Sequence, residues 1–308
     1  MQGIEIARAF YQTKLVPLIE RDFAQYKDRI AIGLVGRGSE CYGFDDEISK
    51  DHDFEPSLCI WLDDEDEREF GFALFRAYSK LCKDHNGDSK SEKSLGGTGG
   101  RGVMTISEFY RGYTGRKGAP ETLDDWLYTP SHYLAEATNG VVFCDPLGNF
   151  SEIREQIKHG IPSDVRLKKI ASCAFYMAQA GQYNYKRCLV HGEVGASRLA
   201  LAEFAKNASE MVYLLNNEHM PYYKWCFRGM RSLDVLSDSA DRLTDILCAS
   251  ACDEEKAIEK IECFCKDVIA ELLRQGLTDS RSDYLENHAY SINEKIKDSR
   301  LRNLPVML

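Results

Sequence analysis

The stretch GLVGRGSECYGFDDEISKDHDFEP, Gly33–Pro56, carries the features that decide the fold and chemistry of the first half of the chain. An apolar run ends in the small-residue turn Gly36-Arg37-Gly38-Ser39, and Asp51 and Asp53 follow soon after it. On an extended segment these two aspartates would project to the same face. Neighbouring carboxylates repel each other and favour a divalent cation between them, and Mg²⁺ prefers oxygen ligands. The stretch therefore predicts a magnesium site at Asp51 and Asp53.

The turn before the aspartates has the chemistry of an anion site. A helix beginning at Ser39 would offer backbone N–H groups and a positive dipole end to a phosphate group. Arg37 and Lys50 flank the predicted site and are candidates for phosphate contacts, the alternative being that both are solvated surface residues. A strand, such a turn and a metal-holding pair together indicate a triphosphate site, where metal neutralises charge as an oxygen displaces pyrophosphate. The alternative is that Asp51 and Asp53 belong to an ordinary solvated turn.

The composition narrows the class of protein. The chain has 308 residues with a formal net charge of −10, so its surface repels nucleic-acid phosphates unless a local basic cleft overrides that charge. Its 11 cysteines are odd in number and no secretory leader is visible, which favours reduced thiols in the cytoplasm. No apolar run approaches the roughly 18 residues that a membrane span needs. We expect a cytoplasmic protein without a membrane partner.

The hydrophobic periodicity predicts two different halves. Residues 4–26 and 68–83 have helical patterns, whereas residues 30–35, 58–62 and 103–106 read as strands. Residues 139–143 and the turn at residues 145–148 look like the last features of the first domain. From about residue 165 the pattern is almost wholly helical, and the apolar stripe of residues 254–275 is its clearest helix. We therefore predict an α+β fold, in which a mixed sheet with flanking helices in residues 1–150 is followed by a helical bundle in residues 151–308.

The arrangement of the turn and the aspartate pair resembles the nucleotidyltransferase superfamily, the DNA polymerase β-like fold. The whole chain is also similar to a bacterial family of nucleotidyltransferase-like proteins of unknown function, the DUF4037 type. The segments that carry this second resemblance are SKDHDFEP (Ser49–Pro56), FCDPLGNF (Phe143–Phe150), AQAGQYNYKRC (Ala178–Cys188) and YYKW (Tyr222–Trp225).

The resemblance implies roles for particular residues. It implies that Gly38 and Ser39 hold the β- and γ-phosphates and that Asp51 and Asp53 ligate magnesium, with two ions possible. The superfamily usually adds a third carboxylate on a later strand, as a metal ligand or as the base for the incoming hydroxyl. Residues 102–106 contain no acid, and Glu108 is the nearest substitute. Either Glu108 fills that role or the third position is empty.

The helical half offers further candidates for nucleotide binding. In related transferases this domain closes over the nucleotide, and the polar side chains of Asn184 and Arg187 have donors suited to phosphate or ribose oxygens. Lys224 stands where antibiotic nucleotidyltransferases place a lysine in their helical domain, next to aromatic residues that could stack on a ring. The alternative for both segments is a polar helix end or an aromatic hinge.

The resemblance implies a magnesium-dependent transferase that moves an NMP, with AMP favoured, from an NTP to a hydroxyl group of a small molecule. The acidic composition suits a cationic acceptor and disfavours DNA or RNA. The second hypothesis is a nucleotide-binding sensor or regulatory protein that transfers nothing, which an empty third carboxylate position would favour. A protein AMP-transferase and a toxin–antitoxin component are further alternatives.

Overall fold

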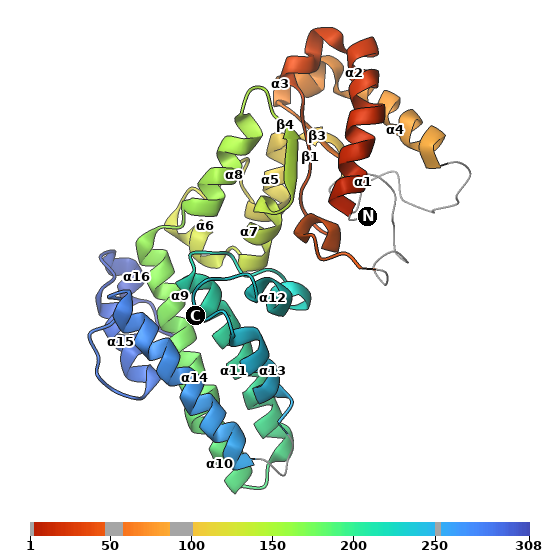
Figure 1. Ribbon diagram of the computed structural model, residues 1–308. Helices are drawn as coiled ribbons and strands as arrows, with labels where there is room; N and C mark the ends of the chain where they lie inside the picture. Colours follow the sequence, from red (N-terminus) through yellow and green to blue (C-terminus); the bar gives the residue numbers. More distant parts are fainter. Residues whose placement is uncertain (1–2, 47–57, 87–100, 250–253) are drawn as a thin grey trace. The chain divides into compact units, whose positions relative to one another are not determined.

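The computed structural model describes residues 3–46, 58–86, 101–249 and 254–308 (Figure 1). The chain divides into two compact units, Met1–Gly160 and Ile161–Leu308. The first unit contains a mixed sheet with helices, and the described part of the second is helical, which confirms the predicted α+β class. The division falls after Gly160, whereas the sequence places it at residue 150, because α8 (Asn149–His159) packs on α7 (Ser131–Thr138) in the first unit.

The first unit begins with helices, and its strands are separated by further helical segments. Its other helical elements are α1 (Gly3–Phe10), the π-helical turn η1 (Tyr11–Leu15), α2 (Val16–Asp22), the 3-10 turns η2 (Ala24–Arg29) and η3 (Ser39–Tyr42), α3 (Asp64–Asp66), the π-helical turn η5 (Glu67–Gly71), α4 (Phe72–Asn86), α5 (Ile106–Thr114) and α6 (Leu123–Tyr128). Its strands are β1 (Ala31–Leu34), β2 (Cys59–Leu62), β3 (Gly102–Thr105) and β4 (Val141–Cys144). Each of the three predicted strands is therefore present among these elements, within a few residues of its predicted bounds, and β4 lies in the stretch that the sequence marks as the end of the first domain.

The four strands form one sheet in the order β3-β2-β1-β4. Strand β1 is antiparallel to both β2 and β4, and β2 is parallel to β3. Ile32 pairs with Ile60, which in turn pairs with Val103. All residues of β1 and β2 are buried, as expected for central strands that are covered on both faces.

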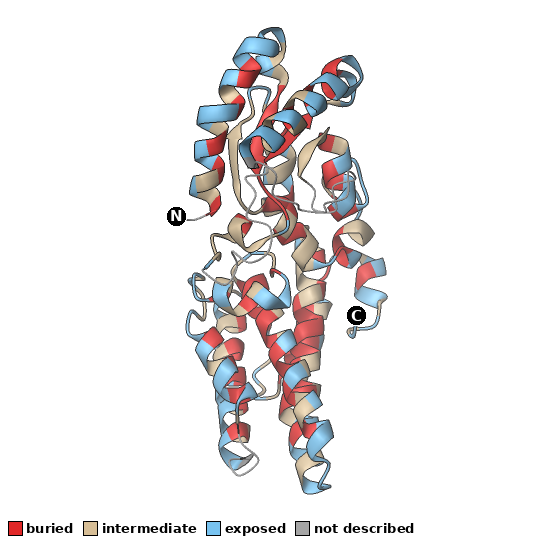
Figure 2. Ribbon diagram, turned by 90° about the vertical axis from the view of Figure 1, so that its right-hand side faces the viewer, coloured by how far each residue is buried: buried red, intermediate tan, exposed pale blue. Residues whose placement is uncertain are grey.

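Alternate residues of the central strands enter different cores, because side chains alternate across a sheet. Ile32 and Ile60 pack with apolar residues of α1, α2 and α4. Trp61 faces the other way and stacks on Phe150 of α8, with 3.7 Å between ring centroids, while Phe109 of α5 meets it edge-on. Figure 1 shows the corresponding helices on the two faces of the sheet, and Figure 2 shows the buried residues on their inner sides.

One end of this sheet gathers the segments in which a site is predicted. Strand β1 ends there, at Leu34, while β2, β3 and β4 all begin there, because Gly33 pairs with Cys59, Cys59 with Gly102 and Leu34 with Val141. We call this the turn end of the sheet, because the Gly36–Ser39 turn follows β1 at this point. The topology thus brings residues that are far apart in the sequence to one edge.

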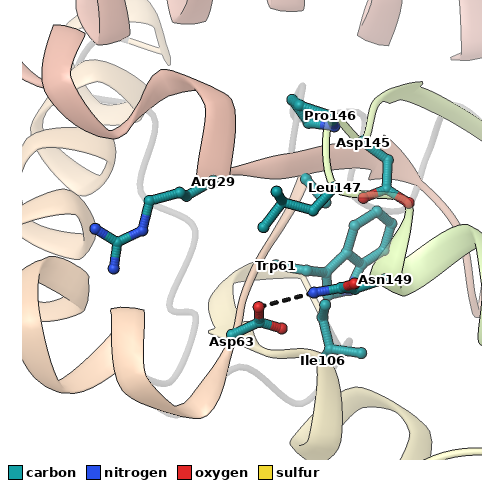
Figure 3. Close-up of a pocket in the computed structure, with 9 residues that line it drawn as sticks. Arg29, Trp61, Asp63, Ile106, Asp145, Pro146, Leu147 and Asn149 are labelled. Carbon is teal, nitrogen blue, oxygen red and sulfur yellow. Dashed lines mark hydrogen bonds between the residues drawn. The ribbon is translucent and has the colours of Figure 1, made fainter.

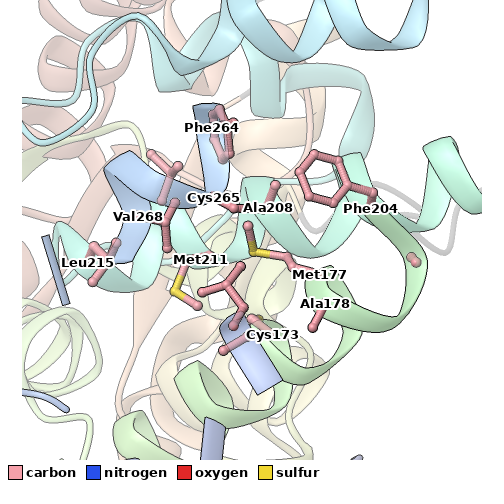
Figure 4. Close-up of a cluster of buried hydrophobic side chains, with 14 of the residues drawn as sticks. Cys173, Met177, Ala178, Phe204, Ala208, Met211, Leu215, Phe264, Cys265 and Val268 are labelled. Carbon is pink, nitrogen blue, oxygen red and sulfur yellow. The ribbon is translucent and has the colours of Figure 1, made fainter. Parts of the chain in front are cut away.

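The second unit consists of helices around one apolar cluster. Its helices are α9 (Ser163–Met177), the π-helical segment η6 (Ala178–Tyr185), α10 (Lys186–Val190), α11 (Val194–Leu215), α12 (Tyr223–Met230), α13 (Ser239–Leu247), α14 (Glu254–Arg274), α15 (Leu285–Glu294) and α16 (Ser299–Asn303). Figure 4 shows Met177, Phe204, Met211 and Phe264 meeting in its interior. Arg166 near the start of α9 donates to the carbonyl of Leu214, near the end of α11, at 2.9 Å, so these two helices run antiparallel.

A buried lysine fastens the last residues of the chain to this bundle. Lys168 on α9 is fully buried. Its Nζ donates to Asn293 Oδ1 at 2.8 Å and to the carbonyl of Leu304 at 2.7 Å. An ammonium group inside a protein needs such acceptors, because burial removes its water. The segment after α16 therefore takes part in satisfying a charge in the interior.

Two helical glycines of this unit allow a matched test of packing. A Cβ atom on Gly181 would lie 2.8 Å from Phe204 Cε2 and 3.0 Å from Ile261 Cγ2, whereas a Cβ atom on Gly195 would meet nothing within 4 Å. We expect Gly181→Ala to lower the free energy of unfolding by about 1–3 kcal/mol, because overpacking outweighs the better helix propensity of alanine.

Urea unfolding of the full chain measures this difference. Gly195→Ala is the control, and we expect it to be neutral or to stabilise the protein by up to about 1 kcal/mol. Equal stability changes in the two variants would contradict the packing that the structure gives to Gly181.

Candidate phosphate-binding turn

The Gly36–Ser39 turn needs glycine at two positions. Gly36 and Gly38 have φ values of 114° and 118°, which side chains with a Cβ rarely adopt. Asn139, just before β4, holds Gly36 in place: the Gly36 N–H donates to Asn139 Oδ1 at 2.8 Å, and Asn139 Nδ2 donates to the Gly36 carbonyl at 2.8 Å. The Tyr113 hydroxyl lies 2.8 Å from the position that a Cβ on Gly36 would take. The turn is thus fixed by contacts with α5 and with the segment before β4.

The backbone of this turn presents hydrogen-bond donors. Within the described parts of the chain, the N–H groups of Arg37, Gly38 and Ser39 have no protein acceptor. The helix that the sequence predicts at Ser39 is only η3, a four-residue 3-10 turn whose N-cap residue, Gly38, has no side-chain cap. Its dipole is correspondingly small, since a macrodipole needs several aligned peptide units. Positive charge at this turn has to come mainly from side chains.

Arg101, directly before β3, supplies such a charge. One of its guanidinium nitrogens donates to the Arg37 carbonyl at 3.1 Å and forms an ion pair with Glu40 of η3. The same nitrogen lies 3.9 Å from Cys41 Sγ. The Arg101 side chain is 17% exposed, so this cation is held at the turn end of the sheet with limited screening by solvent.

Arg37 reaches towards a second carboxylate. Its Nε lies 3.6 Å from Glu136 Oε2 on α7, and the Glu136 side chain is only 13% exposed. Burial raises the pKa of the Glu136 carboxyl above its ordinary value, and the neighbouring Arg37 offsets part of that rise. Burial also lowers the pKa of His132, on the same helix, and Arg37 acts in the same direction. The environment of α7 next to the turn therefore disfavours the charged forms of Glu136 and His132 more than an exposed position would.

Glu108 has a structural partner. It occupies position N3 of α5, where its Oε2 accepts from the Thr105 N–H at 3.0 Å while its own N–H donates to Thr105 Oγ1 at 3.0 Å. This reciprocal pair is a capping box, which satisfies the backbone at a helix start. Glu108, which the sequence suggests as a catalytic carboxylate, therefore already has one oxygen bound to the backbone at the start of α5.

The predicted metal ligands lie outside the described residues. This applies to Asp51, Asp53 and Lys50, which belong to residues 47–57. In the described ranges, no three or more His, Cys, Asp or Glu side chains form a group that could hold a metal ion. The described carboxylates at the turn, Glu40 and Glu136, already face arginines. The described residues alone therefore do not make a magnesium site, and the assignment to Asp51 and Asp53 stays a prediction.

The second unit does not bring its three predicted residues together. Asn184 lies in η6 and Arg187 in α10, next to the start of α11. Lys224 lies in α12, which packs near the end of α11, because the Tyr213 hydroxyl donates to the Cys226 carbonyl at 2.8 Å. At 1.5 Å per residue the length of α11 separates the two places by roughly 30 Å. Arg187 stacks on Tyr183 and Lys224 on Trp225, so each cation has an aromatic neighbour.

A small pocket lies at the opposite end of the sheet. Figure 3 shows Asp63 and Asp145 at this pocket, with Asn149 donating to Asp63 at 2.8 Å and Arg29 on one side. Its open space is about 200 Å³, part of which is solvent. Since Asp63 follows the C-terminal end of β2, the pocket is distant from the Gly36–Ser39 turn along the strands. The two features do not form one site.

Sequence reasoning missed Arg101, Glu136 and Asn139. Arg101 stands at the end of a glycine- and charge-rich stretch that resembles a loop, and Glu136 lies in an ordinary helical pattern. Asn139 joins Gly36 across 103 positions, which no local pattern reveals. The order of the strands is the signal that could have located Arg101 and Asn139. Once that order is known, the residues just before β3 and β4 must lie near the end of β1.

Glu136 gives this site a pH dependence with a definite sign. Its pKa is raised in the folded protein, so the folded state binds more protons than the unfolded state, and stability falls as the pH rises above the ordinary value of 4.5. We expect Glu136→Gln to be more stable than the wild type at about pH 8 and equal to it, within about 0.5 kcal/mol, at a pH where Glu136 is protonated.

Urea unfolding across this pH range measures both proteins. The variant Glu152→Gln, which changes an acid of α8 in the same unit, controls for net charge. If Glu136→Gln were less stable than the wild type at the higher pH, the ion pair with Arg37 would outweigh the cost of burial.

Comparison with known proteins finds a family match for part of the chain. Residues 126–226 match the family described as "Domain of unknown function (DUF4037)". No curated protein matches the chain. A solved structure, the crystal structure of a nucleotidyltransferase-like protein from Exiguobacterium sibiricum 255-15, is similar with 9% identity and a TM-score of 0.38 over 85% of this chain and 77% of that chain. That score is too low to establish a shared fold.

Two further observations bear on the class of protein. None of the helices in the described residues has the length and apolar character that crossing a bilayer requires. The matched segment extends from α6 of the first unit to α12 of the second, and it includes Glu136, Asn139, Asn184, Arg187 and Lys224. The resemblance drawn from the sequence is thus confirmed as a match to the DUF4037 family over residues 126–226.

Proposed function

We propose that the protein is a magnesium-dependent nucleotidyltransferase, which moves an NMP, with AMP favoured, from an NTP to a hydroxyl group of a small molecule and releases pyrophosphate. The observation that carries this proposal is the Gly36–Ser39 turn, where two arginines gather at one end of the sheet with N–H groups that have no acceptor among the described residues. Strand β2 begins at this same end, and only four residues of sequence separate Asp53 from Leu58. The proposal therefore joins the aspartate pair to the turn.

In this proposal the residues of the turn hold the phosphate chain. The N–H groups of Gly38 and Ser39 donate to phosphate oxygens, and Arg37 and Lys50 add positive charge. Asp51 and Asp53 would hold magnesium, which when bound neutralises charge on the phosphates. Glu108 takes no part in this proposal, because it follows the end of β3 that lies opposite the turn, and its Oε2 caps α5.

The acceptor in this proposal is a small molecule with positive charge. The formal net charge of −10 attracts cations and repels polyanions, so a cationic compound with a hydroxyl group suits the surface better than DNA or RNA does. The helical second unit would contribute Lys224, with Tyr222 and Tyr223 beside it, to the nucleotide. The ring centroids of these two tyrosines lie 4.3 Å apart, and the Tyr223 side chain is largely exposed.

A second candidate function is nucleotide binding without transfer. The engagement of Glu108 in the capping box favours it, because β3 itself contains no carboxylate that could replace Glu108. Such a protein would bind the nucleotide at the same turn and act as a sensor or regulatory partner. The two functions differ in pyrophosphate release and not in affinity for the nucleotide.

The aspartate pair is tested by conservative substitution. We expect Asp51→Asn and Asp53→Asn each to lower magnesium-dependent NTP turnover at least about 100-fold with the fold intact, because an amide cannot replace an anionic metal ligand. Pyrophosphate release with a panel of cationic hydroxyl compounds measures turnover, and circular dichroism checks the fold.

Asp28→Asn, at an exposed position in η2, is the matched control and should keep wild-type turnover. Wild-type turnover in Asp51→Asn or Asp53→Asn would refute the metal assignment. Binding of ATP by the wild type without pyrophosphate release from any acceptor in the panel would favour the second candidate.

The separation of the two cationic positions in the second unit gives another test. Because the length of α11 lies between them, one triphosphate is not expected to contact both. We expect Lys224→Met to raise the KM for the NTP about tenfold or more and Arg187→Met to change it less than about twofold. The opposite result would move the nucleotide to the end of the unit that carries Asn184 and Arg187.

A further inference from the structure

The carboxylate of Glu40 lies against the backbone of the Gly36–Ser39 turn. Its carboxyl carbon is 2.7 Å from the position that a Cβ on Gly38 would occupy, so it fills the space that the absence of a side chain leaves there. The same carboxylate forms the ion pair with Arg101, which also donates to the carbonyl of Arg37. An anion therefore already lies on the turn, and it belongs to the chain itself.

Both partners of this ion pair are shielded from solvent. The side chains of Arg101 and Glu40 are 17% and 23% exposed, unlike the pair of Arg21 and Asp22 on α2, where the values are 70% and 41%. Shielded charges are screened less by salt and interact more strongly than surface pairs. A shielded arginine also needs an anionic partner in every state of the protein, because an unpaired buried charge is costly.

We propose that Arg101 binds a phosphate group of the nucleotide, and that the Glu40 carboxylate holds the place of that phosphate on the Gly36–Ser39 turn until the nucleotide displaces it. This inference rests on the proposed function and adds to it a binding residue and a competing internal anion. A carboxylate and a phosphate offer the same chemistry to a guanidinium, since both present two oxygens to its N–H donors.

The exchange favours ligands that carry several phosphate groups. A ligand must replace the contact between Arg101 and Glu40, so its apparent affinity is reduced by the fraction of the protein in which Glu40 occupies the turn. A monophosphate offers little more charge than the carboxylate that it replaces. A triphosphate can keep Arg101 paired and also reach the N–H groups of the turn and Arg37, so this site selects polyphosphate chains.

The proposal predicts effects of opposite sign for the two partners. In titration calorimetry with Mg-ATP, we expect Arg101→Met to weaken binding about tenfold or more, because a charge-assisted hydrogen bond is lost. We expect Glu40→Gln to tighten binding about three- to tenfold, because the competing anion loses its charge. Inorganic tripolyphosphate should show the same pattern, since the contact involves no base or sugar.

The double variant connects the two effects. In the Arg101→Met background, Glu40→Gln should change affinity by less than about twofold, because its benefit depends on releasing Arg101. Arg101→Lys should recover part of the affinity, since it restores the charge but not the planar fork. Arg21→Met and Asp22→Asn remove the same charges from α2 and should leave binding within about twofold of the wild type. Thermal unfolding of each variant checks that it is folded.

Two outcomes would overturn the inference and leave the proposed function in place. If Glu40→Gln weakened Mg-ATP binding as Arg101→Met does, the pair would merely support the turn, and the proposed function would stand without it. If Arg101→Met left the affinity unchanged, Arg101 would not contact phosphate. A wild-type protein that bound neither Mg-ATP nor tripolyphosphate would remove the proposed function itself and this inference with it.

Discussion

The double hydrogen bond between the side-chain amide of Asn139 and the backbone of Gly36 is the constraint on which the candidate site depends. It satisfies both polar groups of Gly36 just beyond the point where β1 ends, and it fixes the turn relative to the start of β4. A turn built on positive φ values would otherwise have many conformations available, since glycine restricts its backbone little. The donors of Gly38 and Ser39 have a defined direction because this neighbour is held.

The two central strands could be predicted from the sequence because they are apolar runs bounded by glycine and acidic residues. Ala31–Leu34 and Cys59–Leu62 are buried on both faces, and such strands are visible as continuous runs of hydrophobic residues. The helix expected at Ser39 was different, since Gly43, with a φ of 67°, ends the 3-10 turn after Tyr42. Local composition indicates that a turn is present there but does not determine how many helical residues follow it.

The charges around the turn could not be predicted, because each comes from a different part of the chain. Arg101 enters through β3, Glu136 through α7 and Glu40 through η3, and only the strand order β3-β2-β1-β4 brings them to one edge. Glu108 illustrates the reverse case. Its position beyond a strand suggested a catalytic carboxylate, but the same position is N3 of α5, where a glutamate stabilises the helix start. A residue type at a given spacing is compatible with both roles.

Lys168 has a consequence for the C-terminal part of the second unit. Its ammonium group obtains one of its two acceptors from a backbone carbonyl, Leu304, outside any helix. A backbone carbonyl is present whatever the side chain, so the residue type at position 304 is weakly constrained, while the path of the chain there is strongly constrained. Substitutions in this segment should therefore be tolerated more readily than insertions or deletions, which would shift the carbonyl away from a buried cation.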